Sequence, residues 1–241
     1  MRLGWGSGGG GFLLTHQAEF VWGRHEVLSR QALLDLLGID PPPDEMAWAP
    51  RFEPSHAARS SRAAFRAGTE RPLVVVHIGA GTAAKCWPAV HWRELMCRLI
   101  VECDPCLVKV GSAIEGARIG ELPGVLNLCG LLSIDELAAL IEDAALLIGA
   151  DSAPAHLAAA IGTPVLAVFS GTNRVEQWRP WGEHVRVIKH ATSCSPCHRR
   201  SCPLADHPCL AGLQPSAVFA AARELLNTRP MEQPIVEEVS L

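Results

Sequence analysis

The sequence predicts an α/β fold built around a Rossmann-like, doubly wound parallel sheet. From Pro72 onward, short β-branched runs alternate with segments of helical periodicity, as in parallel sheets that helices cover on both faces. Several of these runs end in glycine-rich turns. Ligands of such sheets bind at the carboxyl ends of the strands, so these turns are the first place to look for a site.

The elements are expected in a regular order. The strand patterns lie at residues 73–78, 106–110, 125–128, 146–148, 165–169 and 185–188. The helical patterns lie at residues 89–101, 113–120, 133–144, 154–161 and 215–226. Ser133 and Glu136 have the spacing of a capping box, in which each side chain binds the other residue's backbone amide, and they predict where the third of these helices begins.

The first 70 residues do not show this alternation of strand and helix patterns. A glycine-rich loop leads through residues 12–15 into an expected helix, in which Val27, Leu33, Leu34 and Leu37 recur at helical spacing before Gly38 ends it. Prolines 41, 42, 43, 50 and 54 and an Arg/Ala/Ser-rich stretch follow. Residues 40–70 are therefore expected to be a linker with room for one short helix.

Composition excludes several classes of function. The chain has 241 residues, of which 49% are hydrophobic, so it can bury a full-sized core. Lys and Arg number 21 against 25 Asp and Glu, which gives a net charge of −4 and no basic excess for nucleic acid. No apolar run approaches the roughly 20 residues of a membrane span, and no signal peptide is expected. These features favour a cytoplasmic protein.

The most informative segment is residues 149–164. A buried strand ends there, Asp151 or Ser152 is expected to cap the next helix, Pro154 occupies its first turn, and Gly162 ends it. The free amides and positive dipole at such a helix start suit a diphosphate. The alternative is that Asp151 and Ser152 only cap the helix and that His156 is an ordinary first-turn histidine.

Two further strand ends carry candidate ligand-binding side chains. Residues 79–88 form a glycine-rich loop that carries Lys85, whose ammonium group could neutralise phosphate charge, although the loop is not a Walker A sequence. In residues 111–115, Glu115 could accept hydrogen bonds from ribose hydroxyls. The alternatives are a solvated loop lysine and a glutamate that is favoured at a helix start by the dipole.

Together these segments resemble the C-terminal domain of glycosyltransferase family 9, the ADP-heptose:lipopolysaccharide heptosyltransferases. The resemblance runs from about Arg71 to Leu226 and centres on Asp151-Ser152-x-Pro154-x-His156, followed by residues 157–164. Lys85-Cys-Trp-Pro88, residues 111–115 and the helix from Ser133 also match. Residues 1–39, with Leu13-Leu-Thr-His16 and His25-Glu26, resemble the last part of the family's N-terminal domain.

The resemblance implies a GT-B architecture of two Rossmann-like domains. On this basis residues 1–39 are a remnant of the N-terminal acceptor domain, 40–70 a linker, 71–228 the nucleotide-sugar-binding domain and 229–241 a flexible tail. In the family an aspartate of the N-terminal domain is the catalytic base. We expect that part to be missing, so no residue is assigned as the base, and a non-catalytic nucleotide-sugar-binding module is the alternative function. Another GT-B enzyme, such as a sugar-nucleotide epimerase, also stays open.

The resemblance also implies roles for six residues. Lys85 would contact the donor phosphates, Glu115 the ribose and Asp151 the hydroxyls of the transferred sugar. Ser152, Ala153 and His156 would lie at the diphosphate. The family usually has glycine where this chain has Ala153, and an alanine forced to positive φ would cost about 1 kcal/mol.

The implied reaction is an inverting, metal-independent transfer of a heptose-like sugar to a lipopolysaccharide-core or related glycan, with no required cofactor. The implied partners are an ADP-heptose-like nucleotide sugar and a glycolipid acceptor. The implied location is the cytoplasm, with peripheral association at the cytoplasmic face of the inner membrane.

A cysteine cluster occupies an expected loop at residues 191–210. Of the nine cysteines, four are clustered with His198 and His207 interleaved; these are Cys194, Cys197, Cys202 and Cys209. Four thiolates could hold structural zinc or an iron–sulfur centre, although the spacing is irregular for a zinc ribbon. Disulfides and free thiols are the alternatives, and a metal or redox protein built on this cluster is the third hypothesis for function. We interpret the cluster as a structural loop beside the donor site.

Overall fold

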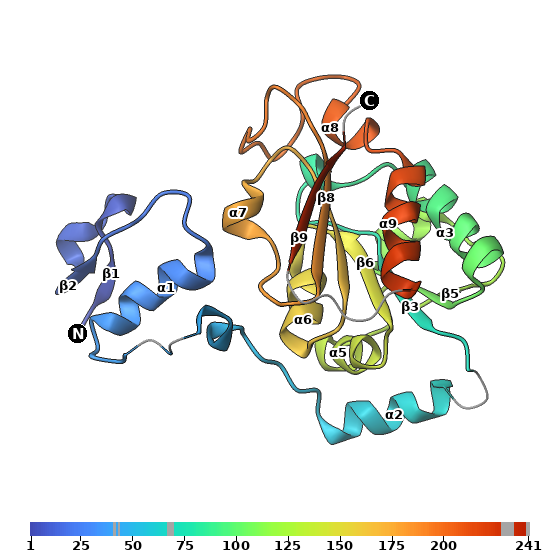
Figure 1. The fold of residues 1–241 in the computed structure, drawn as a ribbon, viewed down its shortest axis with the longest axis horizontal. Coiled ribbons are helices and arrows are strands. Elements are labelled where there is room, and N and C mark those ends of the chain that lie inside the picture. Colours follow the sequence, from blue (N-terminus) through green and yellow to red (C-terminus); the bar gives the residue numbers. More distant parts are fainter. Residues whose placement is uncertain (41, 43, 67–69, 228–233, 240–241) are drawn as a thin grey trace.

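A seven-stranded parallel sheet forms the centre of the molecule (Figure 1). The computed structural model describes residues 1–40, 42, 44–66, 70–227 and 234–239. All six neighbouring pairs in the sheet are parallel, in the order β5-β4-β3-β6-β7-β8-β9. The strands are β3 (Leu73–His77), β4 (Cys106–Val110), β5 (Val125–Asn127), β6 (Leu146–Ala150), β7 (Val165–Phe169), β8 (Val185–His190) and β9 (Ile235–Val239). The order reverses between β3 and β6, so the doubly wound prediction is confirmed.

Side-chain alternation explains why helices cover both faces of the sheet. Val74 and Val76 of β3 join one hydrophobic cluster, whereas Leu73 and Val75 join the other. The first cluster includes side chains of α3 (Ala89–Cys103), α4 (Ala113–Ile119) and α9 (Pro215–Asn227). The second includes side chains of α5 (Ile134–Glu142) and α6 (Ala153–Ile161).

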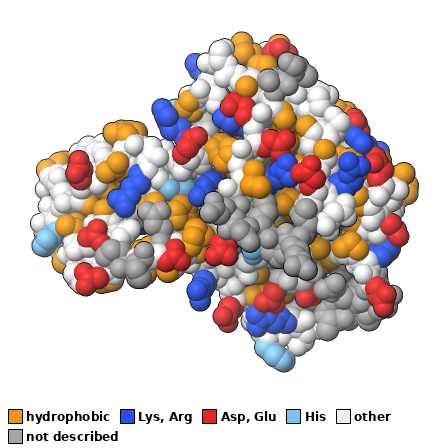
Figure 2. Space-filling model, in the orientation of Figure 1, with side chains coloured by type: hydrophobic (Ala, Val, Ile, Leu, Met, Phe, Trp, Pro, Cys, Tyr) orange, Lys and Arg blue, Asp and Glu red, His pale blue; other side chains and the backbone are white. Residues whose placement is uncertain are grey.

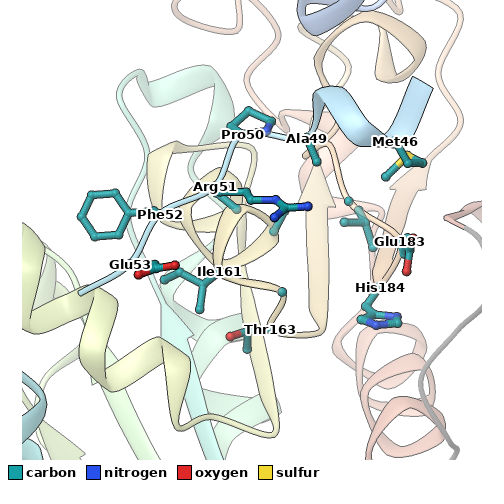
Figure 3. A pocket seen from close by; sticks show the side chains of 15 residues that line it. Met46, Ala49, Pro50, Arg51, Phe52, Glu53, Ile161, Thr163, Glu183 and His184 are labelled. Carbon is teal, nitrogen blue, oxygen red and sulfur yellow. The ribbon is translucent and has the colours of Figure 1, made fainter. Parts of the chain in front are cut away.

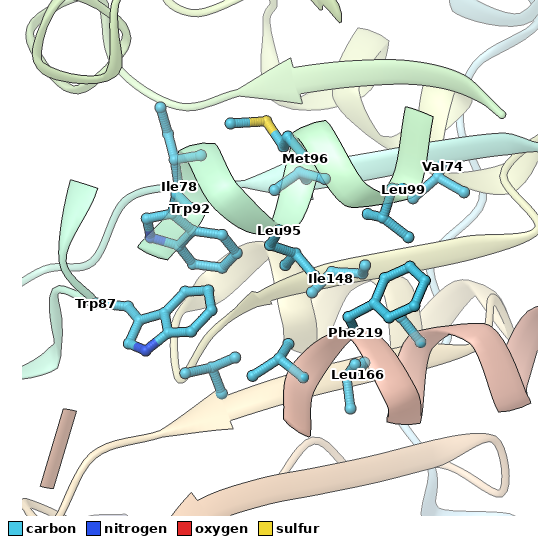
Figure 4. Packing of buried hydrophobic residues seen from close by; sticks show 14 of the residues in the cluster. Val74, Ile78, Trp87, Trp92, Leu95, Met96, Leu99, Ile148, Leu166 and Phe219 are labelled. Carbon is cyan, nitrogen blue, oxygen red and sulfur yellow. The ribbon is translucent and has the colours of Figure 1, made fainter. Parts of the chain in front are cut away.

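The first cluster is dense and aromatic (Figure 4). The Trp87 and Trp92 rings meet edge to face, with centroids 4.8 Å apart, and Phe219 of α9 faces Leu95 and Leu99 of α3. Burying a side chain of this size stabilises a fold by about 1.5–3 kcal/mol. Trp87 also donates from Nε1 to the Leu213 carbonyl at 3.0 Å. This packing fixes the start of α3 directly behind the loop that carries Lys85.

Capping boxes fix the starts of two helices. Ser133 and Glu136 form the predicted box at α5, with the Ser133 amide 2.8 Å from Glu136 Oε2. An equivalent box, which the sequence analysis did not identify, joins Ser112 and Glu115 at α4. Each box satisfies amides that the first helical turn leaves without partners.

The predicted flexible tail is wrong over residues 235–239. These residues form β9, which pairs with β8 along its length and completes the sheet. Glu237 accepts from Arg186 at 2.6 Å, and Lys189 lies 3.4 Å from Glu238. The pattern was missed because β9 lies at a sheet edge, where polar residues interrupt the apolar run. Of the rest of the predicted tail, Pro234 is described, and residues 229–233 and 240–241 lie outside the described residues.

Residues 1–39 form a small region beside the sheet domain, on the left in Figure 1. It contains the parallel strands β1 (Leu3–Trp5) and β2 (His16–Ala18), two short 3-10 turns, η1 (Gly6–Gly8) and η2 (Gly11–Leu13), and the predicted helix α1 (Glu26–Asp35). Phe12 and Trp22 are 84% and 83% exposed. Hydrophobic side chains are visible over this region in Figure 2.

The described residues between 44 and 66 include η3 (Glu45–Trp48) and α2 (His56–Arg66), and α2 contacts the sheet domain. Arg59 of α2 donates to both carboxylate oxygens of Glu142 on α5, at 2.7 and 2.6 Å. Before α2, the Phe52 amide donates to the Ala160 carbonyl at the end of α6, at 3.1 Å. A cavity of about 340 Å³ lies here, between the segment carrying Arg51 and the end of α6 (Figure 3).

The remaining elements are η4 (Ala83–Lys85), α7 (Val175–Trp178) and α8 (Pro208–Ala211). Among the described residues, no helix is both long enough and apolar enough to cross a bilayer.

Candidate functional site

A cavity of about 500 Å³ opens where β3, β4 and β6 end. This is the position at which the strand order reverses, where parallel sheets of this kind bind ligands. Its walls are the turn after β3, the start of α4 and the start of α6. The lining residues are His77, Ala80, Gly81, Thr82, Lys85, Ser112, Glu115, Asp151, Ser152, Ala153 and Pro154.

Lys85 and Asp151 form the central ion pair of the cavity. Lys85 Nζ lies 2.6 Å from Asp151 Oδ2, and their side chains are 21% and 5% exposed. Asn173, from the loop after β7, donates from Nδ2 to the same oxygen at 2.8 Å. Lys85 was predicted to contact the donor phosphates. In this structure its ammonium group instead pairs with the buried carboxylate of Asp151.

The surroundings of Asp151 hold its carboxylate in the ionised form. Burial alone would raise its pKa, because a charged group loses its hydration. The interactions with His156, Lys85 and Asn173 outweigh burial and lower the pKa below its usual value. His156 Nε2 is 4.0 Å from Asp151 Oδ1. This distance is too long for a hydrogen bond, but it is short enough for an electrostatic interaction with the Asp151 carboxylate. Asp151 is thus a charged acceptor on the cavity wall.

Neither Asp151 nor Ser152 caps α6 with its side chain, which corrects the prediction. Ser152 occupies the N-cap position but makes no capping hydrogen bond. Its hydroxyl donates to the Ala150 carbonyl at 3.2 Å and lies 3.1 Å from His77 Nδ1. Burial lowers the pKa of His77 to about 4, so this imidazole is neutral at physiological pH. The first amides of α6 are therefore left without a side-chain cap, beside the cavity.

Ala153 does not have the strained backbone that the family pattern suggested. It is the first residue of α6 and is absent from the described non-glycine residues with positive φ. An alanine is well suited to that position, so its amide stays aligned with the helix. His156 lies one turn further along; its side chain is 42% exposed, and it does not line the cavity.

Glu115 is both a helix-capping residue and a cavity residue. Its Oε2 accepts from the Ser112 amide at 2.7 Å and from the Ser112 hydroxyl at 2.8 Å. Partial burial would raise its pKa, but these hydrogen bonds and neighbouring contacts outweigh burial and lower it. Gly79 makes this position possible, because a Cβ there would overlap the Glu115 carboxylate. The cap thus orients a charged carboxylate toward the cavity.

The structure brings five of the six predicted residues to one cavity: Lys85, Glu115, Asp151, Ser152 and Ala153. Sequence reasoning missed His77, Ser112 and Asn173. The spacing of Ser112 and Glu115 was a readable capping signal, and His77 lies two residues before the turn that was singled out. Asn173 had no local signal, because only the fold brings it beside Asp151.

Comparison with known proteins gives this arrangement a family. The sequence model of glycosyltransferase family 9 (heptosyltransferase) matches residues 2–207. The chain belongs to glycosyltransferase family 9.

Relatives and solved structures agree with this membership. Lipopolysaccharide heptosyltransferase 3 of Escherichia coli is 31% identical over 172 residues, which are 68% of this chain and 49% of that protein. The chain thus spans about half the length of the curated relatives that it matches first.

Among solved structures, E. coli ADP-heptose lps heptosyltransferase II has a TM-score of 0.73 at 24% identity, over 93% of this chain and 69% of that one. The dodecameric iron-containing heptosyltransferase TibC of E. coli, solved with ADP-D-β-D-heptose, has a TM-score of 0.53 at 19% identity, over 65% and 46% of the two chains. At these identities the two structures support the GT-B fold.

The cysteine-rich loop of this family 9 member does not have the geometry of a metal centre. All nine cysteines are free thiols, with Cys194 exposed and Cys209 buried. Over the residues that the structure describes, no group of three or more His, Cys, Asp or Glu is arranged to hold a metal ion. Neither a ligand set of the predicted zinc or iron–sulfur kind nor a disulfide is formed among the described residues. The four clustered cysteines nevertheless lie near one another: burial raises the pKa of the Cys209 thiol, and Cys202, Cys194 and Cys197 raise it further through electrostatic interaction.

The loop instead supports the candidate site through its backbone. The Arg200 carbonyl accepts from the Ala84 amide at 3.1 Å, one residue before Lys85. On the other side, the Cys197 and His198 amides donate to the Gly171 and Thr172 carbonyls, each at 2.9 Å. The loop thus contacts both segments that provide partners for Asp151.

Proposed function

We propose that this chain holds the donor of a heptosyltransferase, which transfers a heptose-like sugar from a nucleoside diphosphate to a lipopolysaccharide-core or related glycan. The observation that carries the proposal is the cavity in which Lys85, Glu115, Asp151 and the uncapped start of α6 converge. Family membership supplies the reaction class.

The two ends of the cavity suit the two ends of a nucleotide sugar. The α6 amides and Lys85 provide positive charge for a diphosphate. Glu115 is oriented to accept hydrogen bonds from ribose hydroxyls, and Asp151 from the hydroxyls of the transferred sugar. TibC was solved with ADP-D-β-D-heptose, and the E. coli heptosyltransferase II is named for ADP-heptose, so ADP-heptose is the first donor to test.

The proposed chemistry is an inverting displacement. An acceptor hydroxyl attacks the anomeric carbon, the bond from that carbon to the diphosphate oxygen breaks, and the nucleoside diphosphate leaves with the electron pair. Negative charge then develops on the leaving phosphate. Lys85 and the α6 amides are placed to stabilise it, as fixed positive groups do in other transfer reactions. The base that removes the acceptor proton is not assigned to any residue of this chain.

Lys85 and the α6 amides support a transfer that needs no metal ion, because they can neutralise the negative charge of the leaving phosphate, as a divalent cation does in other transferases. We therefore expect transfer to be unaffected by a chelator. Metal analysis of the purified chain tests separately whether the four cysteines of the loop bind zinc or iron.

The proposed location is the cytoplasmic face of the inner membrane, where the chain would meet a glycolipid acceptor. Nine free thiols are consistent with a reducing compartment. Fractionation of cells that express the chain tests this placement.

Calorimetric titration with ADP-heptose tests the donor site. The wild-type chain should bind, GDP- and UDP-sugars should compete poorly, and Asp151→Asn and Lys85→Ala should each weaken binding by about ten-fold or more. Lys189→Ala is the matched control, because Lys189 is as buried as Lys85 and also pairs with a carboxylate, Glu238, at 3.4 Å, outside the cavity.

Absence of binding by a folded wild-type chain would contradict the donor site. Binding without turnover in the presence of acceptor would support the alternative, a nucleotide-sugar-binding module that acts with a separate acceptor domain.

A further inference from the structure

Asp151 has an unusual set of partners for a residue that must bind a substrate. Its carboxylate is 95% buried, and the hydrogen-bonded oxygen, Oδ2, receives both Lys85 Nζ at 2.6 Å and Asn173 Nδ2 at 2.8 Å. The other oxygen, Oδ1, faces His156 at 4.0 Å. A buried carboxylate stays ionised only while such partners remain, because removing one leaves a charge without compensation.

Donor binding changes this balance. A diphosphate in the cavity carries more negative charge than one carboxylate and competes for Lys85, the lysine among the residues lining the cavity. When Lys85 turns toward the phosphates, the ion pair weakens while Asp151 must still accept hydrogen bonds from the sugar. Asn173 does not line the cavity, so its amide can stay on Asp151 throughout.

The loop that carries Asn173 is built to hold it in place. Ser170 Oγ and Thr172 Oγ1 are 2.9 Å apart and both side chains are buried. The Gly171 and Thr172 carbonyls accept from the Cys197 and His198 amides of the cysteine-rich loop. Gly171 leaves little room for another side chain, since a Cβ there would lie 3.2 Å from Thr192 Oγ1. The backbone hydrogen bonds from residues 191–210 to Gly171 and Thr172 thus fix the position of the neighbouring Asn173.

We propose that Asn173 is a positioning residue for donor binding, which keeps the Asp151 carboxylate oriented and ionised while Lys85 is engaged by the donor diphosphate. The proposal rests on the proposed function for the role of Asp151 and extends it to a residue outside the cavity. The cysteine-rich loop then acts as the support of this residue.

The consequence is a specific pH dependence. The charged and titratable groups facing the Asp151 carboxylate are Lys85 from η4 and His156 from α6. Behind them, His77 contacts Ser152, and the pKa of His25 in the N-terminal region is lowered by burial and, to a smaller extent, by His156. The nucleotide-sugar affinity should fall at acid pH as Asp151 takes up a proton, and we call this fall the acid limb of donor binding. Asn173→Ala removes an uncharged hydrogen-bond donor and alters no charge. A shift of the acid limb in this variant therefore reports the loss of the Asn173 hydrogen bond.

The test is calorimetric titration with ADP-heptose across acid to neutral pH. Asn173→Ala should bind about ten-fold more weakly, with its acid limb displaced to higher pH, because Asp151 then takes up a proton more readily. Asn173→Asp should lose affinity at neutral pH and recover part of it on acidification, because a protonated Asp at 173 can donate to Asp151 as the amide did.

Asn127→Ala is the matched control. Asn127 Nδ2 donates to the Glu121 carboxylate at 2.8 Å, the same distance as in the Asn173 pair, and neither residue lines the cavity. Its donor affinity and acid limb should equal those of wild type. Thermal unfolding of each variant checks that the chain remains folded.

The outcomes separate this proposal from the donor site itself. If wild type binds and Asn173→Ala binds equally well with the same acid limb, the positioning role is overturned while the donor site stands. If wild type does not bind, the donor site fails. The Asp151 titration midpoint, measured by carboxyl-carbon NMR without donor, then still tests Asn173: an upward shift in Asn173→Ala supports its role, and an unchanged midpoint overturns it.

Discussion

Residues 71–239 and residues 1–39 bury their side chains in different ways. In the sheet domain, every residue of β3, β6 and β7 is buried, and two hydrophobic clusters cover the two faces. In the N-terminal region, the described residues supply no hydrophobic member of the core, and its two strands have three residues each. The buried side chains there are those of His25 and Ser29.

The difference shows that different interactions stabilise the two regions. The sheet domain is stabilised by its own apolar core. The N-terminal region is attached by polar and aromatic contacts. His25 Nε2 donates to the Arg179 carbonyl at 2.9 Å, and the His25 ring lies against that of Trp181, tilted by 44° with centroids 4.3 Å apart. Gln177 donates to Glu26 at 2.9 Å. Substitutions in the two regions should therefore have unequal consequences.

The largest effect is expected from Phe219→Ala. Phe219 is buried in the first cluster, with the Arg98 guanidinium 4.2 Å from its ring centroid. Its loss should lower the free energy of unfolding by about 3–5 kcal/mol, measured by urea titration. The matched variant Phe12→Ala removes an exposed ring and should change the free energy by less than about 0.5 kcal/mol. Equal effects would contradict the comparison.

The next effect concerns pH and His77. Because its pKa is lowered to about 4 in the folded state, the unfolded chain binds a proton here between about pH 6.5 and pH 4 and the folded chain does not. Its contribution to stability is complete above about pH 6.5 and is lost as the pH falls toward 4, up to about 3 kcal/mol. Urea titrations across this range should show a shallower decline in His77→Asn. An identical decline would show that His77 is not responsible.

A smaller, local effect is expected from His25→Ala. This change removes the contacts to Arg179 and Trp181 and the cap on the Val27 amide. The attachment should weaken by about 1–2 kcal/mol, so that limited proteolysis cuts within residues 20–40 faster. The unfolding midpoint of the sheet domain should not move; a matching fall in that midpoint would mean that the two regions unfold together.

The smallest change in stability is expected from Gly79→Ala. The new Cβ would lie on the Glu115 carboxylate, which must then move and give up its hydrogen bonds to Ser112, so the cap of α4 is lost at a cost of about 1 kcal/mol. Binding of ADP should also fall about ten-fold, because Glu115 leaves its position beside the cavity. Gly10→Ala is the control, since nothing lies within 4 Å of a Cβ built there and Gly10 does not line the cavity. Calorimetry with ADP and thermal unfolding of both variants measure the two effects separately.

Much of the fold was predictable because its signals are local. The alternation of apolar runs with helical periods predicted six of the seven strands of the sheet, and the capping box of Ser133 and Glu136 predicted the start of α5. β9 was missed because an edge strand needs no continuous apolar run; only its pairing with β8 makes it a strand.

The candidate site was predictable in part. Lys85, Glu115 and Asp151 follow strands, and a parallel sheet brings the ends of its strands to one edge whatever the side chains are. The N-cap position of Ser152 was predicted correctly, but the expected side-chain cap was not formed, because a local rule cannot foresee that Lys85 and His77 interact with the side chains of Asp151 and Ser152.

The sequence by itself determined the parallel sheet, the helix start at the end of β6 and the glycine turns beside it, because each depends on neighbours within a few residues. Only the tertiary structure decided that Lys85 and Asn173 share one oxygen of Asp151, that Glu115 takes the space left by Gly79, and that the backbone of the cysteine loop contacts two walls of the site. These contacts join residues tens of positions apart, so their geometry exists only once the sheet has formed.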